Sequence, residues 1–308
     1  MSPSRGSILS ALAGNVAVAL IKAGAFLFSA SSAMLVEAIH SAIDTANQVL
    51  LLFGTSRASR PADNTHPFGY GLEAYFWTFV VGLLIFAVGG VASVAEGIHK
   101  IRHPEPVQHL GVTLGVLALA AIFEWASLAF SMREIDRGRP RLFRRRYPHV
   151  TLAQAIHFSP DPGVFEVLAE GVASIFGLGL AFLGVVGSAW FGWRAADGIA
   201  AVSIGALLIL LSLVILVETY SLLSGEAASE PIIEGLREII RADPAILAVQ
   251  TINTMFIGPD MLLVAAIINF RPGLDTLAIE KATDTLCAKL HEAEPRIQQL
   301  FLRPSLPS

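Results

Sequence analysis

Two pairs of ionisable residues stand inside long apolar stretches, and each pair has a spacing of four. His40 and Asp44 form one pair, and Glu166 and Glu170 form the other. A spacing of four places two side chains on one face of a helix, one turn apart, so both can reach one ion. Ionisable groups at membrane depth are costly and are candidates for function. One imidazole and three carboxylates suit Zn²⁺, Mn²⁺, Fe²⁺ or Co²⁺, and the lack of a thiolate argues against Cu⁺.

Each pair also has a purely structural interpretation. His40 and Asp44 could form a hydrogen-bonded pair that binds nothing. Glu166 is close to the start of its apolar stretch, where a solvated carboxylate interacts favourably with the helix dipole. Glu170 lies deeper in the stretch. Lys22 and Glu124 stand alone in other stretches and fit packing, snorkelling or water-lined positions better than ligand positions.

Membrane-spanning helices are the elements that would position these residues. The chain is 54% hydrophobic and only 15% charged, whereas soluble domains carry about 25% charged residues. A span needs roughly 20 mostly apolar residues. Six stretches have this length, at about 8–29, 32–54, 74–97, 109–132, 163–187 and 195–219. We expect an all-α six-helix transmembrane bundle over residues 1–222, with the two pairs on its second and fifth spans.

Basic residues predict the orientation of this bundle. The connector 133–162 carries seven arginines within fourteen residues. Lys and Arg are enriched in cytoplasmic loops, so this connector and both termini are expected in the cytoplasm. Binding of anionic lipid is an alternative role for the arginines.

Residues 225–308 have a different character and predict a small cytoplasmic α+β domain. Helical spacing covers Glu230 to Arg241 and Leu274 to Glu292, and strand patterns cover Leu247 to Ile252, Met261 to Phe270 and Gln298 to Leu302. The only cysteine, Cys287, excludes an intramolecular disulfide. The net charge of −4 gives no basic field for nucleic acid.

The stretch from Ser32 to Gly71 resembles the cation diffusion facilitator family. It reads SAMLVEAIHSAIDTANQVLLLFGTSRASRPADNTHPFGYG, with HxxxD in the second span followed by RPADNTHPFGYG. The resemblance implies a homodimer, a transport site between the second and fifth spans, and a ferredoxin-like C-terminal domain. It assigns His40 and Asp44 to that site. Glu166 and Glu170 stand where His or Asp is usual, after Asp161-Pro-Gly-Val, which resembles the subgroup of the vertebrate zinc-transporter-nine type.

The resemblance also extends to the loop between the second and third spans. Asp63 and His66 match a second, weaker metal site there. Tyr70 stands where zinc exporters often have histidine, so a tight site is not expected. The C-terminal domain has one histidine, His291, and it is expected to fold and dimerise without a metal centre.

These observations predict a divalent cation efflux transporter with no permanently bound cofactor. Zn²⁺, or Fe²⁺, Mn²⁺ or Co²⁺, would exchange for protons because imidazolium cannot bind metal. The expected location is a bacterial inner membrane. One alternative is a membrane scaffold or metal sensor that transports nothing. An intramembrane metalloenzyme is disfavoured because no HExxH motif occurs.

Overall fold

The computed structural model describes residues 5–29, 32–104, 110–137 and 162–305 of the 308-residue chain. At some helix positions only the backbone is described, and Glu166 is one of these positions. The arginine-rich connector lies almost wholly outside the described residues. The packing of the Cα atoms divides the chain into two compact units, and each is treated by itself.

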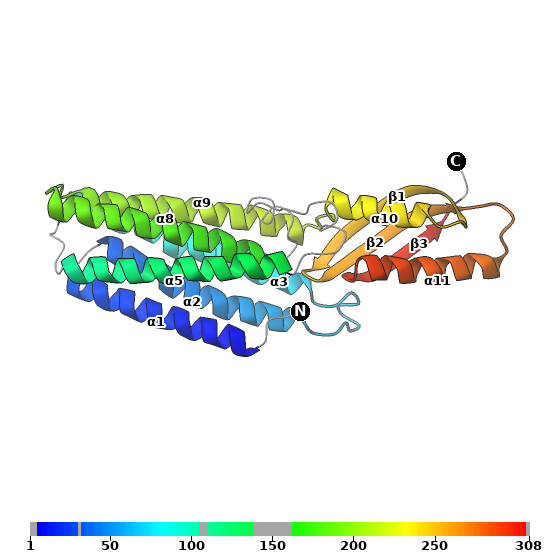
Figure 1. The fold of residues 1–308 in the computed structure, drawn as a ribbon, viewed down its shortest axis with the longest axis horizontal. Coiled ribbons are helices and arrows are strands. Elements are labelled where there is room, and N and C mark those ends of the chain that lie inside the picture. Colours follow the sequence, from blue (N-terminus) through cyan, green and yellow to red (C-terminus); the bar gives the residue numbers. More distant parts are fainter. Residues whose placement is uncertain (1–4, 30–31, 105–109, 138–161, 306–308) are drawn as a thin grey trace. The chain divides into compact units, whose positions relative to one another are not determined.

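The first unit consists of long helices at all six predicted stretches, drawn with nearly parallel axes in Figure 1. They are α1 (Arg5–Ser29), α2 (Ser32–Ala58), α3 (Leu72–Leu84) with η1 (Ile85–Val91) and α4 (Ala92–Arg102), α5 (Leu110–Arg137), α8 (Pro162–Trp190) and α9 (Ala196–Leu223). Among the described residues, four helical segments are long and apolar enough to cross a membrane: Leu72–Arg102, Leu110–Ala129, Ala169–Trp190 and Ala196–Leu223. In α1 the apolar part found is the shorter Val16–Phe28, and α2 carries polar residues along one face.

The third predicted stretch is one helical run of 31 residues, Leu72–Arg102, interrupted by a π-helical segment. This segment, η1, contains the adjacent Gly89 and Gly90, both buried. A Cβ added at Gly90 would lie 3.3 Å from the carbonyl oxygen of Gly205 in α9, and one added at Gly205 would lie 2.9 Å from that of Gly90. Small residues allow such close approach of helix backbones in membranes. Gly205 therefore serves packing in this structure.

The second unit contains the C-terminal α+β domain. Its elements are α10 (Glu230–Arg241), β1 (Ile246–Gly258), β2 (Met261–Phe270), α11 (Thr276–Ala293) and β3 (Ile297–Pro304). The sheet order is β1-β2-β3, with β1 antiparallel and β3 parallel to β2. β1 continues six residues beyond the predicted end at Ile252, because residues 253–258 keep pairing with β2 as far as the turn.

Both helices of this domain cover the same face of the sheet. Alternate residues of β2 point into one buried cluster with apolar residues of α10 and α11. The members from these three elements are Leu262, Val264, Ala266, Ile268, Ile232, Leu236, Ile240, Leu286 and Leu290. In β2, the intervening residues Met261, Leu263, Ala265 and Ile267 are only half-buried, and Phe301 of β3 is 49% exposed. The second face of the sheet is therefore less well covered within one chain.

A segment from far earlier in the sequence belongs to the same unit. The segment Ser56–Tyr75 runs from the last residues of α2 into the first turn of α3, and it groups with the C-terminal residues. Tyr75 is fully buried in the core of the α+β domain. Gly71 lies against the end of β1, where an added Cβ would come within 2.2 Å of the Ile257 carbonyl oxygen and 2.9 Å of Gly258 Cα. The compact unit that holds the α+β domain therefore also includes the residues that connect α2 to α3.

Candidate cation site between α2 and α8

His40 and Asp44 lie on one buried face of α2, as their spacing predicts. Their exposed fractions are 3% and 8%. His40 Nδ1 is 3.5 Å from Asp44 Oδ1, which is longer than a normal N–H···O hydrogen bond of about 2.7–3.2 Å. The two groups are close enough to share a ligand. They are not locked together by a short hydrogen bond.

Glu170 of α8 reaches this face of α2. The Asn47 side-chain amide donates a hydrogen bond to Glu170 Oε1 at 3.3 Å, across 123 residues of sequence. The Glu170 carboxyl group also lies close enough to that of Asp44 for the two to interact. The second and fifth predicted spans therefore face each other at this level, and they bring together His40, Asp44 and Glu170.

Glu166, the fourth predicted ligand, is in the first turns of α8, but its side chain lies outside the described residues. Among the side chains that are described, no three of the His, Cys, Asp or Glu type converge closely enough to hold a metal ion. The described side chains alone therefore do not form a complete coordination site. A bound cation would have to draw the carboxylates and the imidazole inward.

Buried polar atoms without partners mark the same region. Among the described residues, those with no hydrogen-bond partner include seven atoms of α2 and α8: Glu37 Oε1, His40 Nε2, Ser41 Oγ, Asp44 Oδ1, Asn47 Oδ1, Gln48 Oε1 and Ser174 Oγ. Buried polar groups in folded proteins almost always have a partner, which is protein, ordered water or an ion. A row of electron-rich atoms on two facing helices is therefore suited to receive a cation and its water.

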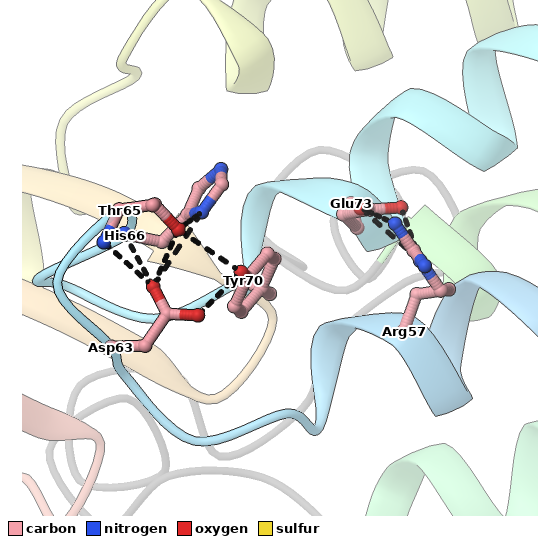
Figure 2. Close-up of polar contacts among 6 residues, drawn as sticks. All are labelled: Arg57, Asp63, Thr65, His66, Tyr70 and Glu73. Carbon is pink, nitrogen blue, oxygen red and sulfur yellow. Dashed lines mark hydrogen bonds and ion pairs between the residues drawn. The ribbon is translucent and has the colours of Figure 1, made fainter.

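The predicted loop site has a different geometry. Figure 2 shows the Asp63 carboxylate surrounded by donors from its own loop. Its Oδ1 accepts from the Thr65 backbone N–H, the Thr65 hydroxyl and the His66 backbone N–H at 2.9, 2.7 and 2.8 Å. Its Oδ2 accepts from the Tyr70 hydroxyl at 2.7 Å. Each oxygen of Asp63 therefore already has an internal partner.

These hydrogen bonds have an electrostatic consequence. The Thr65 hydroxyl, with the Tyr70 hydroxyl and the His66 backbone N–H, holds the pKa of Asp63 well below the ordinary range of an aspartate. The His66 ring nitrogen Nδ1 is 3.9 Å from Asp63 Oδ1 and 3.0 Å from the Thr65 hydroxyl. Both Asp63 and His66 are half-exposed. This arrangement shapes the loop, and a weak metal site at Asp63 and His66 stays a prediction.

The sequence patterns missed two polar contacts at the α2 face. Asn47 is 1% exposed and is the residue that joins α2 to Glu170. Lys22 of α1 does not snorkel: its ammonium donates to Glu37 Oε2 at 3.0 Å, and the two side chains are 1% and 0% exposed. The stripe that contains Glu37, His40 and Asp44 was visible in the sequence. The partner of Glu37 was not, because fifteen residues and a helix connection separate it from Lys22.

Comparison with known proteins gives the family of the chain. The profile of the cation efflux transmembrane domain matches residues 8–224, more than half of the sequence. The chain belongs to the cation efflux family. This confirms the resemblance noted at Ser32–Gly71, and it makes the chain a multi-pass membrane protein of a family of transporters, not of enzymes.

Several relatives carry descriptive names. The mitochondrial proton-coupled zinc antiporter SLC30A9 of Xenopus laevis is 28% identical over 246 residues, covering 80% of this chain and 43% of that protein. Metal tolerance protein C4 of Arabidopsis thaliana is 26% identical over 267 residues, covering 87% and 57%. The cation-efflux pump FieF of Klebsiella pneumoniae is 25% identical over 264 residues, covering 84% and 80%. The chain thus spans about half the length of the first two relatives.

Proposed function

We propose that this chain exports a divalent metal cation in exchange for protons, with His40, Asp44 and Glu170 as ligands and Glu166 as the fourth. One observation carries the proposal. The α2 face that holds His40 and Asp44 meets Glu170 of α8 inside the helical unit, and several buried oxygen and nitrogen atoms there have no partner among the described residues. Hydrophobic packing alone does not account for such a row, because each unpartnered buried polar group costs about 1–3 kcal/mol.

Proton exchange follows from the chemistry of the ligands. Neutral imidazole and ionised carboxylates bind a divalent cation, whereas their protonated forms do not. An unperturbed histidine titrates near pH 6.5, within the range found across cell membranes. Protons arriving at His40 and at the Asp44–Glu170 pair would therefore release the cation. The return of the unloaded site would carry those protons in the other direction.

The ligand types favour Zn²⁺ and leave Fe²⁺, Mn²⁺ and Co²⁺ as alternatives. The name of the Xenopus laevis relative, a proton-coupled zinc antiporter, supports both the metal and the coupling. We place the protein in a bacterial inner membrane with six spans and both termini in the cytoplasm. A homodimer would form through the C-terminal ferredoxin-like domain, whose β2–β3 face is incompletely covered within one chain.

The test is cation uptake by the purified protein in proteoliposomes, with a metal-sensitive dye and a pH-sensitive dye inside. Wild type should move Zn²⁺ and protons in opposite directions, and His40→Ala and Asp44→Asn should abolish both signals. His291→Ala is a matched control, because His291 is an exposed histidine of the C-terminal domain whose Nδ1 lies 2.9 Å from the Cys287 carbonyl oxygen. Wild-type flux in folded His40→Ala protein would refute the site. Metal flux without proton movement would refute the exchange.

A further inference from the structure

The Lys22–Glu37 ion pair is a fully buried charged contact of the helical unit. Lys22 Nζ lies 3.0 Å from Glu37 Oε2, and the side chains are 1% and 0% exposed. Removing two charges from water is costly, and the attraction between them repays that cost only when the remaining hydrogen-bonding positions are also satisfied. Here they are not, because Glu37 Oε1 has no partner among the described residues. Structural stabilisation alone therefore explains this pair poorly.

The position of Glu37 relates the pair to the candidate site. Glu37 precedes His40 by three residues and Asp44 by seven, so the three side chains follow one face of α2 over two turns. Glu37 Oε1 also lies against α8, where a Cβ added at Gly177 would be 3.0 Å from it. Gly177 comes seven residues after Glu170, again two turns. The two helices thus present Glu37 at one level and Asp44 with Glu170 at another.

Two serines lie between these levels. Ser41 of α2 and Ser174 of α8 are 3% and 1% exposed, and neither hydroxyl oxygen has a partner in the described structure. Ser41 follows Glu37 by one turn, and Ser174 precedes Gly177 by one turn. Unpartnered oxygen atoms therefore continue from Asp44 to Glu37 along the same pair of helices. A cation that leaves Asp44 and Glu170 in this direction meets Glu37 next.

We propose that Glu37 is a second cation-binding position of the pathway, and that the Lys22 ammonium is its resident counterion. This inference rests on the proposed transport function. A passing divalent cation binds Glu37 through the free Oε1, and the ammonium withdraws from Oε2. When the cation leaves, the ammonium returns, so the carboxylate never stays charged without a partner. The tethered ammonium thereby limits how long the cation resides at Glu37.

Three variants separate this role from simple packing. Lys22→Gln keeps a hydrogen-bond donor but removes the competing charge, so the cation should bind at least about tenfold more tightly, with a lower KM and a lower maximal rate. Glu37→Gln leaves the ammonium without its partner beside the pathway, so KM should rise by about tenfold or more. The double variant Lys22→Gln/Glu37→Gln is neutral and can keep a side-chain hydrogen bond. It should recover a wild-type KM and keep a reduced maximal rate.

The experiment measures Zn²⁺ flux against Zn²⁺ concentration in proteoliposomes of the full chain, together with thermal unfolding in detergent. Lys289→Gln is the matched control, because it breaks an ion pair with Asp243 at the same 3.0 Å in the other unit, and it should leave KM and maximal rate unchanged. A double variant with wild-type KM and wild-type maximal rate would overturn the proposal, since the pair would then act only in packing. So would single variants that lower the unfolding temperature without changing KM. Absence of flux from wild-type protein would instead reject the proposed function.

Discussion

Replacement of Asn47 gives a direct test of whether Glu170 must be held in place for the cation to bind. Asn47 is 1% exposed, and its amide donates to Glu170 Oε1 at 3.3 Å. A hydrogen bond to a charged group contributes about 1.5–3 kcal/mol. The distance here is long, so the lower end applies, and about 1.4 kcal/mol corresponds to a tenfold change in an equilibrium constant. Asn47→Leu, which keeps the volume and loses the donor, should weaken Zn²⁺ binding by about tenfold.

The assay is Zn²⁺ titration of the detergent-purified protein by calorimetry, followed by flux at several Zn²⁺ concentrations. Flux of Asn47→Leu should show a raised KM and a nearly normal maximal rate, because the metal ligands themselves are intact. Asn269→Leu is a matched control: this buried asparagine also donates from its amide, to the Ser305 carbonyl at 2.7 Å, but in the C-terminal domain. It should lower stability and leave Zn²⁺ affinity unchanged. Unchanged affinity in Asn47→Leu would refute the positioning role.

Three further predictions concern packing and the loop. Gly205→Ala would place a Cβ 2.9 Å from the Gly90 carbonyl oxygen, so detergent unfolding should show a loss of about 1–3 kcal/mol, whereas Gly179→Ala, with open space around it, should not. Gly71→Ala would bring a Cβ within 2.2 Å of the Ile257 carbonyl oxygen of β1. The segment Ser56–Tyr75 should therefore separate from β1 and become sensitive to limited proteolysis. The pKa of Asp63 is lower in the folded protein than the ordinary pKa of an aspartate. The hydrogen bonds to its carboxylate are therefore fully retained at any pH above the ordinary pKa, and they are lost only as the pH falls through the lower pKa of the folded protein. Proteolysis of this loop should therefore be the same at pH 7 and pH 5 in wild type, and faster at both in Asp63→Asn.

The positions of the helices were predictable because a bilayer imposes a simple rule on the sequence. Each of the six apolar stretches coincides with a long helix, and the structure extends most of them by a few residues. The π-helical segment at Ile85–Val91 was not predictable from hydropathy, and neither was the close approach of α9 to this segment at Gly90 and Gly205. Hydropathy reports burial along one helix and carries no information about which neighbour a glycine touches.

The candidate site was predictable to the extent that helical periodicity determines it. The spacing of His40 and Asp44 placed them on one face of α2, and the same rule placed Glu170 inward on α8. Asn47 was missed because an amide in an apolar stretch gives no charge signal. The packing of Gly71 and Tyr75 with the α+β domain was missed because Gly71 belongs to a stretch that reads as a membrane connector and Tyr75 belongs to the predicted third span, 74–97.

The polar face of α2 links the stability of the helical unit to its cargo. α2 is not among the four described segments that pass as membrane-crossing by length and apolarity, and its buried face includes Glu37, His40 and Asp44 with unpartnered atoms. A cation that satisfies these atoms in the folded state, and not in the unfolded one, must stabilise the fold by RT ln(1 + [L]/Kd), about 2.7 kcal/mol at a hundredfold excess over Kd. Protons at the same groups would satisfy them in part. Under the proposed exchange, either the cation or protons on the same groups stabilise the bundle, and the empty, fully ionised site is the least stable form. This thermodynamic penalty on the empty site is what would oblige cation release to be accompanied by proton uptake.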